Sequence, residues 1–197
     1  MGILACYLMP HPPIMIPEVG GPETKDVDST IKSAETVGRE IQELNPDTIV
    51  IISPHGPVFQ DALCVYDFPL KGSLANFRAP QVKMEFDNDE ELYEEILQKS
   101  ARHKIPIVRA SDLSPARYGI KHELDHGVIV PLYFINKSAK DFRLLPMAFG
   151  MISYEDLYAF GRLINEAAES LNRKVVVIAS GDLSHRLTAD APAGYAP

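Results

Sequence analysis

Five short apolar runs constrain the fold of this chain more than any other feature of its sequence, because each is bounded by turn-forming residues. They span residues 3–9, 48–52, 105–108, 142–148 and 175–179. Several of them are apolar on both alternating faces, which is typical of central parallel strands that helices cover on both sides. The runs therefore predict a buried and mainly parallel sheet.

Amphipathic patterns between these runs predict helices. Apolar residues repeat at three-to-four spacing over 31–44, and Pro46 ends that pattern. A second pattern covers 88–100, with its acidic residues near the N-terminal end, where the helix dipole favours them. Ser153, with Asp156 three residues later, predicts the start of a third helix.

Strands that alternate with helices predict an α/β fold, a three-layer sandwich with a mainly parallel central sheet and helices on both faces. The chain has 197 residues, 46% of them apolar, and can bury the core of a single domain over residues 1–197. The stretches 58–66 and 81–86 predict extra strands, which we interpret as an antiparallel excursion.

The formal net charge of -8 argues against nucleic acid or an anionic membrane as a partner, because such partners need clustered Lys and Arg. The apolar N-terminal stretch has no basic leader and is interrupted by Pro10, so we interpret it as a strand and not as a signal peptide or membrane span. Cys6 and Cys64 have neither metal-type nor disulfide spacing. These features predict a cytoplasmic protein with reduced cysteines.

The histidines are the most informative polar residues. His11 follows the first apolar run in MPHPPIMIP, His55 follows the second in IVIISPHGP, and His185 follows the last in VVVIASGDLSH. Ligands of an open α/β sheet bind beyond the carboxyl ends of its strands, so we expect these three side chains to converge. His126, in ELDHGVIVPLYFI, precedes an apolar segment and is expected at the edge of the same core.

The two remaining histidines are interpreted differently. His103 lies in QKSARHK, the basic end of a helix, where a cation at the C-terminal dipole explains it. His122 is not assigned to the same site.

Four histidines without a cysteine ligand favour a non-haem metal site. Two imidazoles and one carboxylate on one face of Fe(II) form a facial triad that leaves positions open for O2 and substrate. A further histidine near those positions can move protons, since its unperturbed pKa lies near neutrality. Zn(II) accepts the same ligands, so ligand type alone does not decide between the two metals.

Four ordered motifs, HPP, SPHG, DHG and SGDLSH, resemble those of the class III extradiol ring-cleavage dioxygenase superfamily. The chain resembles most the microbial branch related to the Memo proteins and found in AmmeMemoRadiSam system protein A. The resemblance implies His11 and His55 as metal ligands, His185 as the acid/base beside the substrate and His126 as a residue of the substrate pocket. It also implies Fe(II) as the metal, a small catecholic substrate and O2.

One part of the family pattern is missing. The dioxygenases place a glutamate ligand well downstream of the late-strand histidine and the Memo proteins a cysteine, whereas neither residue follows His185 here. Asp190 is the carboxylate in that stretch, and we interpret it as a turn residue. We therefore expect that the chain lacks C-terminal elements and a third ligand, and that a homodimer covers the exposed edge of the sheet.

Two other functions fit the same residues. In the first, the chain is a non-catalytic accessory domain that binds a radical-SAM partner protein, which is the context that the resemblance implies. In the second, it is a zinc-dependent hydrolase, because histidines at strand ends serve that chemistry too.

Several further side chains could orient His185, line a substrate cleft or contact the substrate. Those for orienting His185 are Asp182 and Ser184. Those for the wall of a substrate cleft are Phe59, Tyr66, Phe77 and Tyr118. Those for contacting an acidic group of the substrate are Arg78, Arg117 and Lys121.

Overall fold

The computed structural model describes residues 1–118, 121–182, 184–191 and 194–196. Leu183 of the SGDLSH motif lies outside the described residues, as do three residues of the Ala/Pro/Gly-rich stretch that follows.

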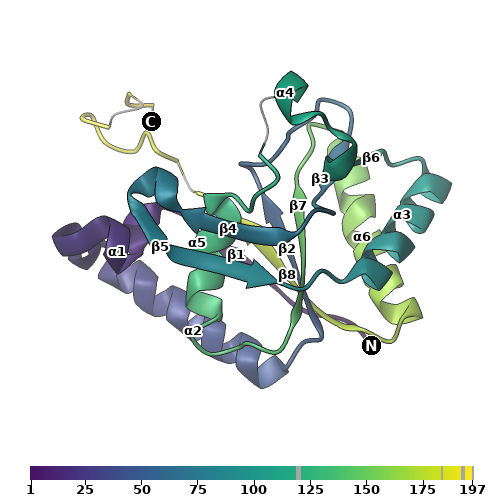
Figure 1. Ribbon diagram of the computed structural model, residues 1–197, viewed down its shortest axis with the longest axis horizontal. Coiled ribbons are helices and arrows are strands. Elements are labelled where there is room, and N and C mark those ends of the chain that lie inside the picture. Colours follow the sequence, from purple (N-terminus) through teal and green to yellow (C-terminus); the bar gives the residue numbers. More distant parts are fainter. Residues whose placement is uncertain (119–120, 183, 192–193, 197) are drawn as a thin grey trace.

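Within the described residues, six strands form the central sheet (Figure 1). Their order across the sheet is β1 (Gly2–Met9), β8 (Lys174–Ser180), β2 (Thr48–Ser53), β7 (Arg143–Ala148), β3 (Leu63–Val65) and β6 (Ile107–Arg109). β3 runs antiparallel to β7, and the other neighbouring pairs are parallel. The predicted α/β class with a mainly parallel sheet is confirmed.

Helices cover both faces of this sheet (Figure 1). One face carries α2 (Asp28–Leu44), α5 (His126–Ile135) and a hairpin of β4 (Leu70–Leu74) and β5 (Ala79–Phe86), and the other carries α3 (Glu90–His103) and α6 (Tyr154–Ser170). Two further α-helices have four residues each, α1 (Pro17–Gly20) and α4 (Pro115–Tyr118). Among the helices of the described residues, none has the length and apolarity needed to cross a bilayer.

Alternating side chains of the central strands supply two separate cores. Ile49 and Ile51 of β2 pack with α2 and α5, whereas Val50 between them packs with α3 and α6. Each of these side chains is fully buried. Burial of one such side chain contributes about 1.5–3 kcal/mol, which explains why the runs are apolar on both faces.

The predicted helices and turns occur close to their expected positions. Asn45, in the left-handed region at φ 46°, ends α2 just before Pro46. Ser153 caps α6 by accepting a hydrogen bond from the backbone N–H of Asp156. Of the two extra strand predictions, 81–86 forms part of the antiparallel hairpin with β4, whereas 58–66 contributes only β3, which joins the central sheet.

Asp89 connects the N-terminal end of α3 to the starts of three strands. Its carboxylate is fully buried and caps α3 by accepting from the backbone N–H of Leu92. It also accepts from the Thr48 hydroxyl of β2 and forms ion pairs with Arg173, at 3.3 Å, and Arg143, at 3.6 Å. This cluster lies at the edge of the sheet opposite the carboxyl ends of the parallel strands.

Asp89→Ala is expected to lower the free energy of unfolding by about 3 kcal/mol, because it removes the cap of α3, leaves the buried Thr48 hydroxyl without its acceptor and takes one of two carboxylate partners from Arg173. Urea unfolding followed by circular dichroism measures the change. Asp61→Ala, at an exposed position, serves as the matched control and should change stability by less than about 0.5 kcal/mol. Equal stability of the two variants would contradict the assigned role of Asp89.

Candidate functional site

Three histidines from distant parts of the chain meet at the carboxyl edge of the sheet. His11 follows β1, His55 follows β2, and His126 is the first residue of α5. One ring nitrogen from each lies within 4.8 Å of the other two. The Nε2 atoms of His11 and His55 are 2.9 Å apart. We refer to these three residues as the histidine cluster.

The orientation of His11 is set by a chain of hydrogen bonds through Ser180, the last residue of β8. The Ser180 hydroxyl donates to the backbone carbonyl of Gly127, which can only accept. Its oxygen therefore accepts from His11 Nδ1, at 2.9 Å. The proton of neutral His11 is thereby placed on Nδ1, which leaves the Nε2 lone pair directed toward His55.

The Asp125 carboxylate holds the other two histidines in place. It is the N-cap of α5 and accepts from the backbone N–H of Val128, which fixes the start of the helix at His126. The Ser53 hydroxyl donates to Oδ1 of Asp125 at 2.6 Å, and Ser53 in turn accepts from the backbone N–H of His55. One carboxylate thus joins the loop of His55 to the helix of His126.

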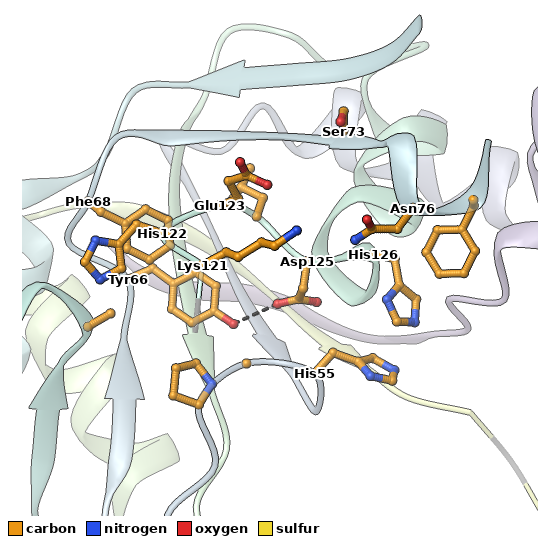
Figure 2. Close-up of a pocket in the computed structure, with 15 residues that line it drawn as sticks. His55, Tyr66, Phe68, Ser73, Asn76, Lys121, His122, Glu123, Asp125 and His126 are labelled. Carbon is orange, nitrogen blue, oxygen red and sulfur yellow. Dashed lines mark hydrogen bonds between the residues drawn. The ribbon is translucent and has the colours of Figure 1, made fainter. Parts of the chain in front are cut away.

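Two observations show how closely the start of α5 is packed against its neighbours. Tyr66 donates its hydroxyl to Oδ2 of Asp125 at 2.7 Å (Figure 2). At Gly127, an added Cβ would lie 2.4 Å from Ser53 Oγ and 3.1 Å from a ring carbon of His55. Only glycine fits between these two groups without moving them.

His185 is linked to the histidine cluster through Asp182. Oδ2 of Asp182 lies 3.2 Å from Nε2 of His185 and 3.4 Å from Nε2 of His11. Oδ1 of the same carboxylate accepts from the backbone N–H of His11. The side chain of His185 is 67% exposed, so it lies at the outer side of the site. The sequence had named Asp182 as a candidate for orienting His185, and the structure places it between that residue and His11.

Burial favours the neutral form of His11 and His126, which is the form that a metal ion requires. The pKa of His126 is lowered to about 4, mainly by burial and also by the neighbouring His55, while Asp125 opposes the shift. Burial also lowers the pKa of His11, against the opposing charge of Asp182. Burial raises the pKa of Tyr66, and the Asp125 charge adds to this, so its hydroxyl stays protonated as a donor.

A cavity of about 300 Å³ opens beside His55 and His126 (Figure 2). Its walls include the aromatic rings of Tyr66, Phe68 and Phe77. The ring of His122 lies parallel to that of Phe68, with centroids 5.3 Å apart, and its Nε2 is buried without a hydrogen-bond partner among the described residues. A cavity of this size accommodates a small single-ring molecule.

The structure separates the residues that the sequence had grouped as pocket candidates. Lys121, Tyr66 and Phe77 line the cavity, whereas Arg78 and Arg117 are not among its lining residues. Phe59 and Tyr118 pack against each other instead, with ring centroids 6.3 Å apart.

Two predictions about residues outside the cluster are confirmed. His103 lies in the last turn of α3, as the dipole argument predicted. Asp190 is an exposed turn residue, and the Thr188 hydroxyl, a hydrogen-bond donor to it, lowers the pKa of its carboxyl.

The sequence reasoning did not identify the residues that orient the cluster, and it set His122 aside. Ser53 and Ser180 each end a β-branched run immediately before a histidine loop, and both are buried. A serine at the end of an apolar strand was the available signal, because a hydroxyl that is buried with its strand requires a hydrogen-bond partner.

The sequence profile of the family described as the catalytic LigB subunit of aromatic ring-opening dioxygenase matches residues 5–197. The chain belongs to the LigB family. The predicted resemblance to the class III extradiol dioxygenases is thereby confirmed, and Memo-type relatives of the chain agree with the predicted branch.

Three relatives illustrate this membership. Protein CA_C1420 of Clostridium acetobutylicum is 43% identical over all of this chain, which covers 42% of that protein. A MEMO1 family protein of Pyrococcus abyssi is 32% identical over 71% of this chain, and the match covers 43% of the Pyrococcus protein. A MEMO1 family protein of Archaeoglobus fulgidus is 28% identical over 80% of this chain, covering 52% of it. This LigB-family chain thus spans about half or less of the length of these relatives.

The residues of the cluster fit the non-haem metal that LigB-family proteins bind. Three imidazole nitrogens lie within 4.8 Å of one another, the hydrogen bond of His11 Nδ1 leaves a lone pair on its Nε2, and burial lowers the pKa of His126. These are the properties of a first ligand set with oriented outer partners. Among the described residues, no carboxylate or thiol joins this group.

Asp125→Ala is expected to weaken metal binding by about 10–100-fold, because outer partners of metal ligands have effects of that size. It should also lower the free energy of unfolding by about 1–3 kcal/mol, since buried donors lose their acceptor. Metal titration and urea unfolding measure the two effects.

Ser153→Ala provides the control, because it removes the cap of α6 on the opposite face of the sheet. It should cost about 1 kcal/mol of stability and leave metal affinity unchanged. Unchanged metal affinity in folded Asp125→Ala would contradict the role given to this carboxylate.

The metal-free chain is expected to lose stability as the pH falls from about 6.5 toward 4. In the unfolded chain His126 binds a proton near its ordinary pKa of 6.5, whereas its folded pKa is about 4, so the unfolded state binds more protons in this window. Above pH 6.5 neither state holds that proton, and His126 contributes no pH dependence. Urea unfolding with a chelator present, between about pH 7 and pH 5, measures the slope.

His126→Asn should reduce this slope, whereas His103→Asn, on the exposed end of α3, should retain it. Identical slopes in wild type and His126→Asn would show that His126 is not the group responsible.

Proposed function

We propose that this chain forms the metal centre and substrate cavity of a non-haem Fe(II) enzyme that cleaves the ring of a catechol-type substrate with O2. The observation that carries the proposal is the histidine cluster, three imidazoles converging beside a cavity at the carboxyl edge of the sheet. Membership of the LigB family supports the same chemistry. The substrate and the activity of the whole protein are part of this proposal.

The proposed ligands are His11, His55 and His126. His126 is the third ligand in the proposal because its nitrogen lies with those of the other two. A bound Fe(II) ion would supply the open coordination positions and redox chemistry that allow O2 to react with a catechol. His126 also lines the cavity, so the role implied by the family resemblance is retained.

His185 is the proposed acid/base. Its Nε2–H donates to Asp182, 3.2 Å away, which orients the ring, so Nδ1 is the atom that takes a proton from a substrate hydroxyl and returns it to the product. The aromatic walls of the cavity hold the substrate ring and exclude water, and Lys121 contacts an acidic substituent of the substrate.

A zinc-dependent hydrolase is the second candidate. The specific observation in its favour is that the cluster contains imidazoles alone among the described residues, and three histidines are also the donor set of a catalytic zinc site. The choice between the two candidates therefore depends on which metal the protein holds.

The predictions about partners and location remain proposals. We propose a homodimer that pairs through β1, which hydrogen-bonds to a neighbour on one side only within the described sheet. A cytoplasmic location agrees with the free Cys6 and Cys64. Binding of a radical-SAM protein is the accessory role that would remain if the cluster holds no metal.

The decisive experiment is metal analysis of the chain purified without added metal, followed by anaerobic Fe(II) loading and O2 uptake with catechol. Fe(II) binding and O2 uptake are expected. His11→Ala, His55→Ala and His126→Ala should each abolish both, because each removes a ligand. His103→Ala is the matched control and should retain both.

Two other results would favour the alternative functions. Retained zinc with no O2 uptake favours the hydrolase. Absence of metal binding in wild type overturns both metal-dependent functions and favours the accessory role.

A further inference from the structure

α5 contains a proline in its interior, where this residue is strongly disfavoured. Pro131 is the sixth residue of the helix and is buried. A proline at this position costs about 3 kcal/mol relative to alanine. A protein tolerates such a cost where the absence of the N–H is itself useful.

In a regular helix, the backbone N–H of residue 131 would donate to the carbonyl of Gly127, four residues earlier. Pro131 has no N–H and cannot form this hydrogen bond. In the structure, that carbonyl instead accepts the hydroxyl proton of Ser180, from β8. A proline ring also crowds the carbonyl four residues back, so that the two cannot approach as closely as in a regular helix. Pro131 thus makes the carbonyl of Gly127 available to a residue outside the helix.

The hydrogen bond to Gly127 is what makes Ser180 an acceptor for His11. Once the hydroxyl proton points to Gly127, the Ser180 oxygen presents a lone pair to His11 Nδ1, at 2.9 Å. Ser180 is 8% exposed and His11 3% exposed, so water has little access to replace either bond. The tautomer of His11 therefore depends on the Gly127 carbonyl, which accepts from Ser180 and receives no N–H from residue 131.

We propose that Pro131 is a positioning residue that sets the tautomer of His11 through Gly127 and Ser180. Its value for metal binding rests on the proposed function, whereas its effect on the tautomer does not. Replacement of Pro131 by a residue with an N–H restores the hydrogen bond within the helix. The Ser180 hydroxyl then turns to donate to His11 Nδ1, and the imidazole proton moves to Nε2, the atom that faces His55.

Two variants of Pro131 test this proposal. Pro131→Ala restores the N–H, and Pro131→Val restores it with a side chain close to proline in volume, which separates the hydrogen bond from a packing defect. Long-range proton–nitrogen NMR of the metal-free chain reads the tautomer of His11 directly. Wild type should carry the proton on Nδ1, and both variants should carry it on Nε2.

Metal affinity gives the second readout. Both Pro131 variants are expected to bind Zn(II) about tenfold more weakly than wild type, as for other outer partners of metal ligands. Ser180→Ala should have a similar effect. Because Pro131 acts through Ser180, the double variant Pro131→Ala/Ser180→Ala should bind Zn(II) no more weakly than Ser180→Ala alone. Pro17→Ala, at the exposed start of α1 where the N–H has no partner within the helix, should change neither readout.

The outcomes separate the two proposals. An Nδ1 proton in wild type and in both Pro131 variants overturns the positioning role, as does an additive loss of affinity in the double variant. A wild-type chain that binds no Zn(II) or Fe(II) but shows the tautomer change upholds the positioning role and overturns the proposed function.

Discussion

The Asp125 carboxylate at the start of α5 is the interaction on which the rest of the site depends. It caps the helix, accepts from Tyr66 and, through Ser53, holds the loop that carries His55. The body of α5 is apolar on every side and is buried between the sheet and the hairpin. The loops therefore cannot shift without leaving buried donors unsatisfied, which costs about 1–3 kcal/mol for each group.

The burial of His11 and His126 also determines their chemical state. Removal from water disfavours a charged imidazole, and three close imidazoles disfavour it again, so the pKa values of His11 and His126 fall. Neutral imidazoles are what a cation needs as ligands. His185 lies outside the cluster, exposed and beside Asp182, and this position assigns it to proton transfer in the proposed function.

The sequence predicted much of the fold and part of the site. Strand ends placed His11 and His55 at one edge because parallel strands share a direction, and the capping pattern located α6 at Ser153. The partners of the histidines were not predictable in the same way. Ser180 at a strand end looks like any turn residue, and its role depends on a carbonyl 53 residues away in the chain.

What the sequence by itself determined was the layered α/β fold, from the period of its apolar residues, and the family, from the order of its histidine motifs. What only the tertiary structure decided was which polar side chains meet. Lys121 lines the cavity while Arg78 does not, and the nitrogen of His126 joins those of His11 and His55. The physical reason is that periodicity specifies which face of an element is buried, whereas hydrogen bonds between distant elements depend on ångström-scale positions that exist only after packing.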